Sequence, residues 1–425
     1  MLRRQFVNYL THGFAAVAGA PLLPIKNIPA VSLQNGNKND ERFWAFVREQ
    51  FPLTHERVYL NTGGLGASPY AVIDAVVARM NELEKISETG HSEQIWASIK
   101  QKAAALLGCD AEEIAYTRNA TEGINIVCNG LPLKRGDEVI TTTHEHVGNA
   151  VPWLARQKRD GIVIKLFAPS TQAAPENLER IERLISQRTR LISVPHATTT
   201  TGQILPVKEI AALAKAKKLW LFIDGAQTAG MLNFNLHDIG CDAYATSGHK
   251  WLLGPKGTGL LYVRKNMLDT VQALEVGAYS DKSHDLQTGE LTLHPTAQRY
   301  EYGTVSAPIF GGLGAAIDFL TTIGMENVWT RIAALSTAFL NGLQEIPNVE
   351  ILSPVDSSAR SAMITFKMKN LEYLKLQSFL AEKYKLRTRG VGEGGVNALR
   401  VSWHLYNSFE EVNRVLEGVK EAAKL

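Results

Sequence analysis

Two short apolar segments end in polar residues that could act together in one reaction. The segment LWLFID ends at Asp224, and the segment DAYATS ends at Ser247, three residues before Lys250. In an open α/β sheet, the strand ends that face the ligand lie side by side, so the acid and the amine would meet there. A lysine amine can form a Schiff base, and a carboxylate can keep a ring nitrogen protonated. The pair favours pyridoxal phosphate, although a solvated loop charge would explain either residue alone.

Two further segments could hold the phosphate and the substrate. The glycine-rich loop NTGGLG (61–66) lacks side chains that would keep a ligand away from the backbone. A polar turn at 117–121 precedes a predicted helix, and the N–H groups at a helix N-terminus bind anions. Asn119 or Thr121 could also simply cap that helix, which is compatible with phosphate binding.

The elements that must position these residues alternate along the chain. We predict strands at 114–117, 138–143, 162–167, 189–195, 219–224 and 242–247, and helices at 71–83, 95–108, 175–185 and 208–218. This alternation predicts a mostly parallel sheet with right-handed crossovers. The tail predicts a small α+β domain, and its last helix starts with Ser408 and Glu411 in capping-box spacing. We expect a possible export signal and linker at 1–40, a large cofactor-binding domain at 41–310 and a small domain at 311–425.

Composition excludes several classes of protein. The chain has 425 residues, of which 45% are hydrophobic and 20% charged, as in globular proteins of two domains. The net charge of +3 and the lack of a basic block disfavour a nucleic-acid partner. The sequence contains no run of 18 or more apolar residues, so we predict no ordinary membrane span. Three cysteines without CxxC spacing exclude a disulfide framework, and His144 and His146 have no third ligand nearby, so we expect no metal.

The N-terminus has the pattern of an export signal. Arg3 and Arg4 precede a weakly apolar run that ends in Ala18–Gly19–Ala20, which resembles a twin-arginine signal with its cleavage site. We therefore expect export to the periplasm. The alternative is a cytoplasmic protein whose N-terminal arm packs on its own surface.

From about Tyr59 to its C-terminus, the chain resembles the class V aminotransferases. The motifs that carry the resemblance are YLNTGGLG, TRNATEGIN, EHVGNAVPW, DGAQ, SGHK, YEYGT and LRVSWHLYN, in the order of that family. This group of fold-type I pyridoxal-phosphate enzymes includes the cysteine desulfurases and isopenicillin N epimerase. The resemblance implies a large, mostly parallel α/β domain and a small C-terminal α+β domain.

The resemblance also implies roles for individual residues. Lys250 would bind the cofactor as a Schiff base and move the Cα proton, Asp224 would pair with the ring nitrogen, and Gln227 would bond the phenolic oxygen. His146 would stack on the ring face away from Lys250. The expected phosphate contacts are Ala120, Thr121, Ser247, His249 and Thr304.

Substrate binding and assembly follow from the same resemblance. Arg400 would clamp the α-carboxylate of an amino-acid substrate, beside Gly63 in the glycine loop. Thr304 would reach the phosphate of the neighbouring subunit, so we expect a homodimer with shared active sites.

Two departures from the family bear on the reaction. Thr199 stands where desulfurases carry an asparagine, and its role is open. The loop 387–397 contains no cysteine, whereas desulfurases attack the substrate sulfur with a thiolate from this loop. Overall similarity favours epimerisation or transamination at Cα, with His146 as the acid opposite Lys250 in an epimerase.

Three other functions compete with this interpretation. Elimination of a β-substituent, as in C–S or C–Se lyases, needs no loop cysteine and is the alternative reaction. A non-catalytic cofactor-binding protein is disfavoured because Lys250, Asp224 and Arg400 are all present. A nucleotide-binding enzyme is disfavoured because neither GxGxxG nor GxxxxGK[ST] occurs where a strand leads into a helix.

Overall fold

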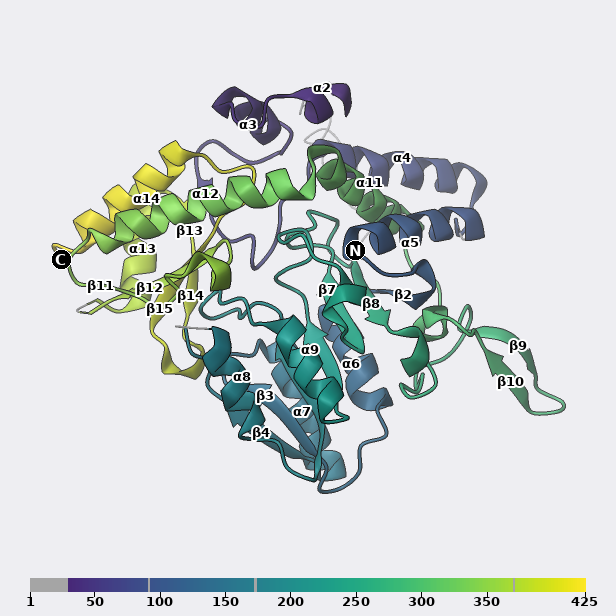
Figure 1. Ribbon diagram of the computed structural model, residues 1–425. Helices are drawn as coiled ribbons and strands as arrows, with labels where there is room; N and C mark the ends of the chain where they lie inside the picture. The colour runs from purple at the N-terminus through teal and green to yellow at the C-terminus, as the bar shows by residue number, and fades with distance from the viewer. Residues whose placement is uncertain (1–29, 91, 172–173, 370) are drawn as a thin grey trace, which may run out of the picture. The chain divides into compact units, whose positions relative to one another are not determined.

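The computed structural model describes residues 30–90, 92–171, 174–369 and 371–425 (Figure 1). The chain divides into two compact units, 1–35 and 36–425. Helix α2 (Ala30–Asn35) is the described part of the first unit. The predicted export signal lies outside the described residues, and export stays a prediction.

A seven-stranded sheet in the order β2-β8-β7-β6-β5-β3-β4 forms the centre of the second unit. Its strands are β2 (Ile114–Thr117), β3 (Glu138–Thr142), β4 (Val163–Phe167), β5 (Thr189–Pro195), β6 (Trp220–Asp224), β7 (Ala243–Ser247) and β8 (Gly259–Val263). Strand β8 runs antiparallel to both neighbours, and the other adjacent pairs are parallel. The predicted fold class is confirmed. Most strands are short apolar runs because the central strands of such a sheet are buried on both faces.

Helices precede and connect these strands. They are α4 (Tyr70–Ile86), α5 (Glu93–Leu107), α6 (Ala120–Gly130), α7 (Val147–Asp160), α8 (Ala174–Glu182), α9 (Val207–Ala216) and α10 (Leu236–Ile239). Of these, α6, α7 and α9 contact the sheet directly. Helix α3 (Glu41–Arg48) precedes the first short strand, β1 (Val58–Tyr59). The hairpin of β9 (Asp281–Asp285) and β10 (Glu290–Leu293) extends away from the rest of the unit (Figure 1).

A second, antiparallel sheet in the order β11-β12-β15-β14 lies in the C-terminal part. Its strands are β11 (Val349–Ile351), β12 (Met363–Met368), β14 (Arg389–Val391) and β15 (Ala398–Ser402), and the helices are α11 (Ala307–Ile323), α12 (Met325–Gln344), α13 (Tyr373–Tyr384) and α14 (Phe409–Ala422). The capping box of α14 is confirmed. The predicted boundary at 310/311 stays a prediction.

The segment around β1 packs into the apolar core beside the second sheet. Strand β1 pairs in parallel with β13 (Leu386–Arg387), and Val58 and Leu60 are buried in the same apolar cluster as Phe339, Phe366 and Trp403. The glycine loop (61–66), one residue after β1, contacts both parts: Gly63 lies against Arg400 of β15, and the N–H of Gly66 donates to the carbonyl of His249. No single described helix is long and apolar enough to cross a membrane; α11 and α12 pass that test only as a pair bent by 79°.

Candidate active site

Asp224 and Lys250 line one narrow pocket at the ends of β6 and β7. Asp224 ends β6, and Lys250 lies three residues after the end of β7. The two side chains are 6% and 8% exposed. The pocket is lined by His146, Pro195, Ala197, Thr199, Asp224, Ala226, Gln227 and Lys250. Neighbouring strand ends thus bring the predicted acid and amine together.

Burial changes the proton affinity of both groups. It lowers the pKa of the Lys250 amine to about 8, although the charge of Asp224 acts in the opposite direction. It raises the pKa of the Asp224 carboxyl, against the charge of Lys250 and the N–H of Ala226, which donates to Oδ1 at 2.9 Å. Lys250 therefore becomes a free, nucleophilic amine closer to neutral pH than an exposed lysine does.

His146 is a neutral imidazole at the wall of this pocket. It caps α7, and its Nδ1 accepts the N–H of Gly148 at 3.0 Å. Burial, followed by the charge of Lys250, lowers its pKa to about 4. A neutral ring whose Nδ1 accepts carries its proton on Nε2. A side chain at Gly148 would collide with the hydroxyl of Thr121, which places Thr121 beside His146.

The start of α6 and the end of β7 form the predicted phosphate site. Asn119 caps α6 by accepting the N–H of Glu122, and the N–H of Ala120 donates to Oγ of Ser247 at 3.1 Å. Next to Lys250, the buried Nδ1 of His249 has no hydrogen-bond partner among the described residues. The site therefore offers an anion a helix N-terminus, a hydroxyl and an imidazole without another partner.

Gln227 connects the pocket with the glycine loop. Its Nε2 donates to the carbonyl of Gly63 at 2.9 Å and contacts Oγ1 of Thr199 at 3.5 Å, while Nε1 of Trp251 donates to its Oε1 at 2.9 Å. These bonds fix the amide orientation, with the NH₂ group on the side of Gly63 and Thr199.

Arg400 is completely buried beside the same loop. Its Nη1 donates to the carbonyl and the hydroxyl of Thr199 at 2.7 and 2.8 Å, and its Nη2 donates to Oδ1 of Asn61 at 3.3 Å. A Cβ atom at Gly63 would lie 2.8 Å from Nη2, so the glycine makes room for the guanidinium. Thr199, whose role the sequence leaves open, holds Arg400 in place.

Comparisons with known proteins agree with this arrangement. Residues 59–415 match the family model of the class-V aminotransferases. The chain belongs to this family. A cysteine desulfurase of Serratia proteamaculans is 30% identical over 406 residues, which cover 89% of this chain and 98% of the relative. The cystine C–S lyase C-DES, solved with its product cysteine persulfide, is 28% identical over 88% of this chain and 99% of its own, with a TM-score of 0.80. The cysteine desulfurase of Thermococcus onnurineus NA1 is 25% identical over 89% and 98%, with a TM-score of 0.79.

The pocket fits pyridoxal phosphate, the cofactor of the class-V family. A buried amine can form the Schiff base of this cofactor, and a buried carboxylate can pair with its ring nitrogen. The unpartnered Nδ1 of His249 and the N-terminus of α6 suit its phosphate. The structure thus brings nearly all of the predicted cofactor residues into one region, while their individual roles stay predictions.

Thr304 does not line the Lys250 pocket of its own chain. It lines a separate cavity of about 940 Å³, together with Arg118, Glu122 and Tyr302. This position is compatible with its predicted contact to a neighbouring subunit, which stays a prediction.

Glu145, a buried acid next to His146, was not predicted from the sequence to have a role in the site. Its carboxyl accepts from Thr141 at 3.1 Å and from Asn149 at 2.9 Å. Burial, followed by the charge of Asp224, raises its pKa to about 8. Its position between two histidines resembles a metal pattern, which the lack of a third nearby ligand disfavours. The signal for its structural role is Asn149, four residues later in the sequence.

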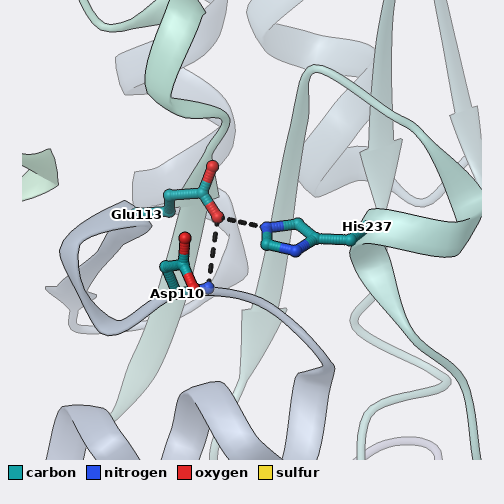
Figure 2. Close-up of side chains that lie close together, drawn as sticks. All are labelled: Asp110, Glu113 and His237. Carbon is teal, nitrogen blue, oxygen red and sulfur yellow. Dashed lines mark hydrogen bonds and ion pairs between the residues drawn. The ribbon is translucent and has the colours of Figure 1, made fainter.

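A group with metal-like spacing occurs elsewhere, at Asp110, Glu113 and His237 (Figure 2). Both oxygens of Glu113 are already used: one accepts from Nε2 of His237 at 2.6 Å and the N–H of Asp110 at 3.2 Å, the other from the N–H of Lys265 at 2.8 Å. We therefore interpret the group as a contact between loops that joins α10 to the start of β2.

The lowered pKa of Lys250 predicts how cofactor loading depends on pH. Below pH 8 most of the amine is protonated and cannot attack an aldehyde, so the loading rate of the apoenzyme should rise about tenfold per pH unit and level off above pH 8. Stopped-flow absorbance after mixing with pyridoxal phosphate measures this rate. In Asp224→Asn the midpoint should move to lower pH, because the charge of Asp224 raises the pKa of Lys250. A midpoint near 10 in the unmodified chain would contradict the burial of Lys250.

Proposed function

We propose that this chain is a pyridoxal-phosphate-dependent C–S lyase that eliminates the sulfur substituent of a cysteine derivative. Two observations support this proposal. Lys250 lines one pocket with Asp224 and His146, and the loop 387–397 contains no cysteine. Its relatives include cysteine desulfurases and a cystine C–S lyase. These findings favour the elimination alternative over epimerisation or transamination, which the sequence had favoured.

The three cysteines of the chain support elimination over persulfide transfer. Cys128 and Cys241 are buried, and Cys109 is half-buried. Burial raises the pKa of Cys109 and of Cys128 to about 12, so neither is a thiolate near neutral pH. None of them has the properties of the nucleophile that a desulfurase needs.

The residues of the chain divide the reaction between them. Arg400 binds the α-carboxylate and orients the substrate, and Lys250 takes the proton from Cα. When bound at Lys250 and Asp224, the cofactor would supply an electron sink for the negative charge left at Cα. The Cβ–S bond then breaks and the sulfur leaves with its electron pair. Hydrolysis of the released enamine gives pyruvate and ammonia.

His146 is better suited to covering the ring than to donating a proton. Because its pKa is about 4, only about one molecule in a thousand carries the imidazolium at pH 7. An epimerase needs an acid on the face opposite Lys250, and this group is rarely protonated there. The scarcity of the imidazolium therefore disfavours epimerisation.

Parallel product assays test the proposed reaction. The purified holoenzyme is incubated with L-cystine, L-cysteine, other L- and D-amino acids and selenocysteine, and pyruvate, sulfide or persulfide, keto acids and racemised substrate are measured. We expect pyruvate in equal amount to the sulfur product, and unchanged yields in Cys109→Ala. Racemisation or keto-acid formation without sulfur release would refute the lyase.

We further propose a homodimer in which Thr304 serves the neighbouring subunit. Thr304→Ala should weaken pyridoxal-phosphate binding about tenfold, because a hydrogen bond to a charged phosphate is lost. Mixed dimers of Lys250→Ala and Thr304→Ala subunits should regain one site of normal affinity per dimer, since that site combines an intact lysine with an intact threonine. Absence of such a site would place Thr304 in its own subunit's site.

A further inference from the structure

The rings of Trp251, His404 and Tyr406 form one stack next to the cofactor pocket. The ring centroids of Trp251 and His404 lie 5.5 Å apart at 26°, and those of His404 and Tyr406 lie 5.3 Å apart at 17°. Trp251 follows Lys250 directly, whereas His404 and Tyr406 lie in the loop between β15 and α14. All three stacked side chains are completely buried. The stack therefore connects the segment of Lys250 with the C-terminal part of the chain.

His404 holds the backbone of Trp251 in a defined tautomer. Its Nδ1 accepts the N–H of Leu405 at 2.8 Å, and its Nε2 lies 3.2 Å from the carbonyl oxygen of Trp251. A carbonyl can only accept, so Nε2 carries the proton and donates. Burial lowers the pKa of His404 to about 4, which keeps the ring neutral near pH 7. The neutral imidazole thus combines a flat stacking surface with one donor and one acceptor.

Both hydrogen bonds that orient the amide of Gln227 lead back to this stack. On the oxygen side, Nε1 of Trp251 donates to Oε1 at 2.9 Å. On the nitrogen side, Nε2 donates to the carbonyl of Gly63 at 2.9 Å. Gly63 follows Thr62, whose buried hydroxyl bonds the hydroxyl of Tyr406. The contacts form a closed circuit that runs from the stack to Gln227 and back.

The amide of Gln227 keeps a donor for a ligand in the pocket. Of its two N–H groups, one bonds the glycine loop, and the second has only a contact of 3.5 Å to Thr199. Gln227 lines the pocket of Lys250. The second N–H group is therefore the one that can bind the phenolic oxygen of pyridoxal phosphate.

We propose that His404 and Trp251 are positioning residues that act on the cofactor through the amide of Gln227. Neither of them lines the pocket. His404 holds Trp251, Trp251 holds the amide oxygen, and the NH₂ group is thereby directed at the phenolic oxygen. The inference rests on the proposed function for the place of the cofactor, but it does not depend on which reaction follows.

Loss of this support should raise the pH at which the Schiff base of the holoenzyme loses its proton. A donor at the phenolic oxygen stabilises the negative charge that remains there once the neighbouring nitrogen is deprotonated. In Trp251→Phe an aromatic ring stays in the stack, but Oε1 of Gln227 loses its donor in a buried place. Titration of the visible absorbance should show a midpoint higher by about one pH unit, the effect of one hydrogen bond to a charged group.

A double variant shows whether Trp251 acts through Gln227. Gln227→Ala should raise the midpoint at least as much as Trp251→Phe does. The combination of both substitutions should raise it no further than Gln227→Ala alone, because the two residues share one pathway. Additive shifts would show that Trp251 acts independently of Gln227 and would overturn the inference.

Two substitutions at His404 test the other end of the circuit. His404→Phe keeps a ring in the stack and loses the bond to the carbonyl of Trp251, so the midpoint should rise less than in Trp251→Phe. If His404→Phe does not fold, His404→Asn takes its place, and the midpoint should again rise because the stack is lost.

Trp403→Phe is the matched control. Trp403 is as buried as Trp251, but it packs against Phe339, and its Nε1 has no hydrogen-bond partner among the described residues. The control should lower the melting temperature and leave the absorbance titration unchanged, whereas Trp251→Phe should also weaken pyridoxal-phosphate binding about fivefold.

These measurements separate the positioning role from the reaction. If the midpoints shift as expected but no substrate is eliminated, the lyase proposal fails and the role of His404 and Trp251 stands. If Trp251→Phe and the His404 variant titrate like the unmodified holoenzyme, or if Gln227→Ala does, the inference is overturned.

Discussion

Replacing Lys250 with alanine is expected to reduce pyruvate formation by about 10³- to 10⁴-fold. The variant loses the proton-transferring base, whose contribution is of this order, together with the covalent anchor of the cofactor. Lys250 is buried with Asp224 in the pocket, and no other lysine lines it among the described residues. Steady-state pyruvate release measures the loss, and the absorbance of the holoenzyme should lose the Schiff-base band that borohydride bleaches in the unmodified protein.

Lys256→Ala is the matched control for this experiment. Lys256 lies six residues later on an exposed turn and does not line the pocket. The Lys256→Ala variant should leave both the absorbance and the turnover unchanged. A Lys250→Ala protein that remains yellow after dialysis and borohydride treatment, or retains more than a few per cent of turnover, would contradict the assignment of Lys250.

Asp224→Asn is expected to lower kcat by about 100- to 1,000-fold, the usual effect of losing one preorganised charge next to a reacting group. The substitution keeps the shape and the oxygen that accepts the N–H of Ala226, but removes the negative charge that keeps a ring nitrogen protonated. Turnover and the dissociation constant of pyridoxal phosphate measure the effect.

A charged cofactor analogue separates electrostatics from packing at Asp224. N-methylated pyridoxal phosphate carries a permanent positive charge and should restore part of the activity of Asp224→Asn. Asp238→Asn, on the exposed surface of α10, is the control and should behave like the unmodified enzyme. Failure of the analogue, together with a lowered melting temperature, would indicate that Asp224 acts mainly in folding.

The order of the elements could be predicted because local patterns determine it. Apolar runs ending at Asp224 and Ser247 predict strands, and the alternation with helices predicts a parallel sheet, which the structure confirms. The antiparallel direction of β8 and the pairing of β1 with β13 were not predicted. Both depend on contacts between distant segments, which periodicity does not report.

The sequence by itself determined the cofactor chemistry, because Lys250, Asp224 and the motifs around them are short and contiguous. It also determined that the loop 387–397 has no cysteine, which disfavours persulfide formation by a thiolate of this loop. Only the tertiary structure decided the surroundings of these groups. The support of Arg400 by Thr199, the raised pKa of the Glu145 carboxyl and the cross-strand position of Arg389 arise from strands and loops that are far apart in the chain. Burial sets the protonation state of these groups, and strand register sets the face of the sheet to which a side chain points. Both exist only once those segments have packed together.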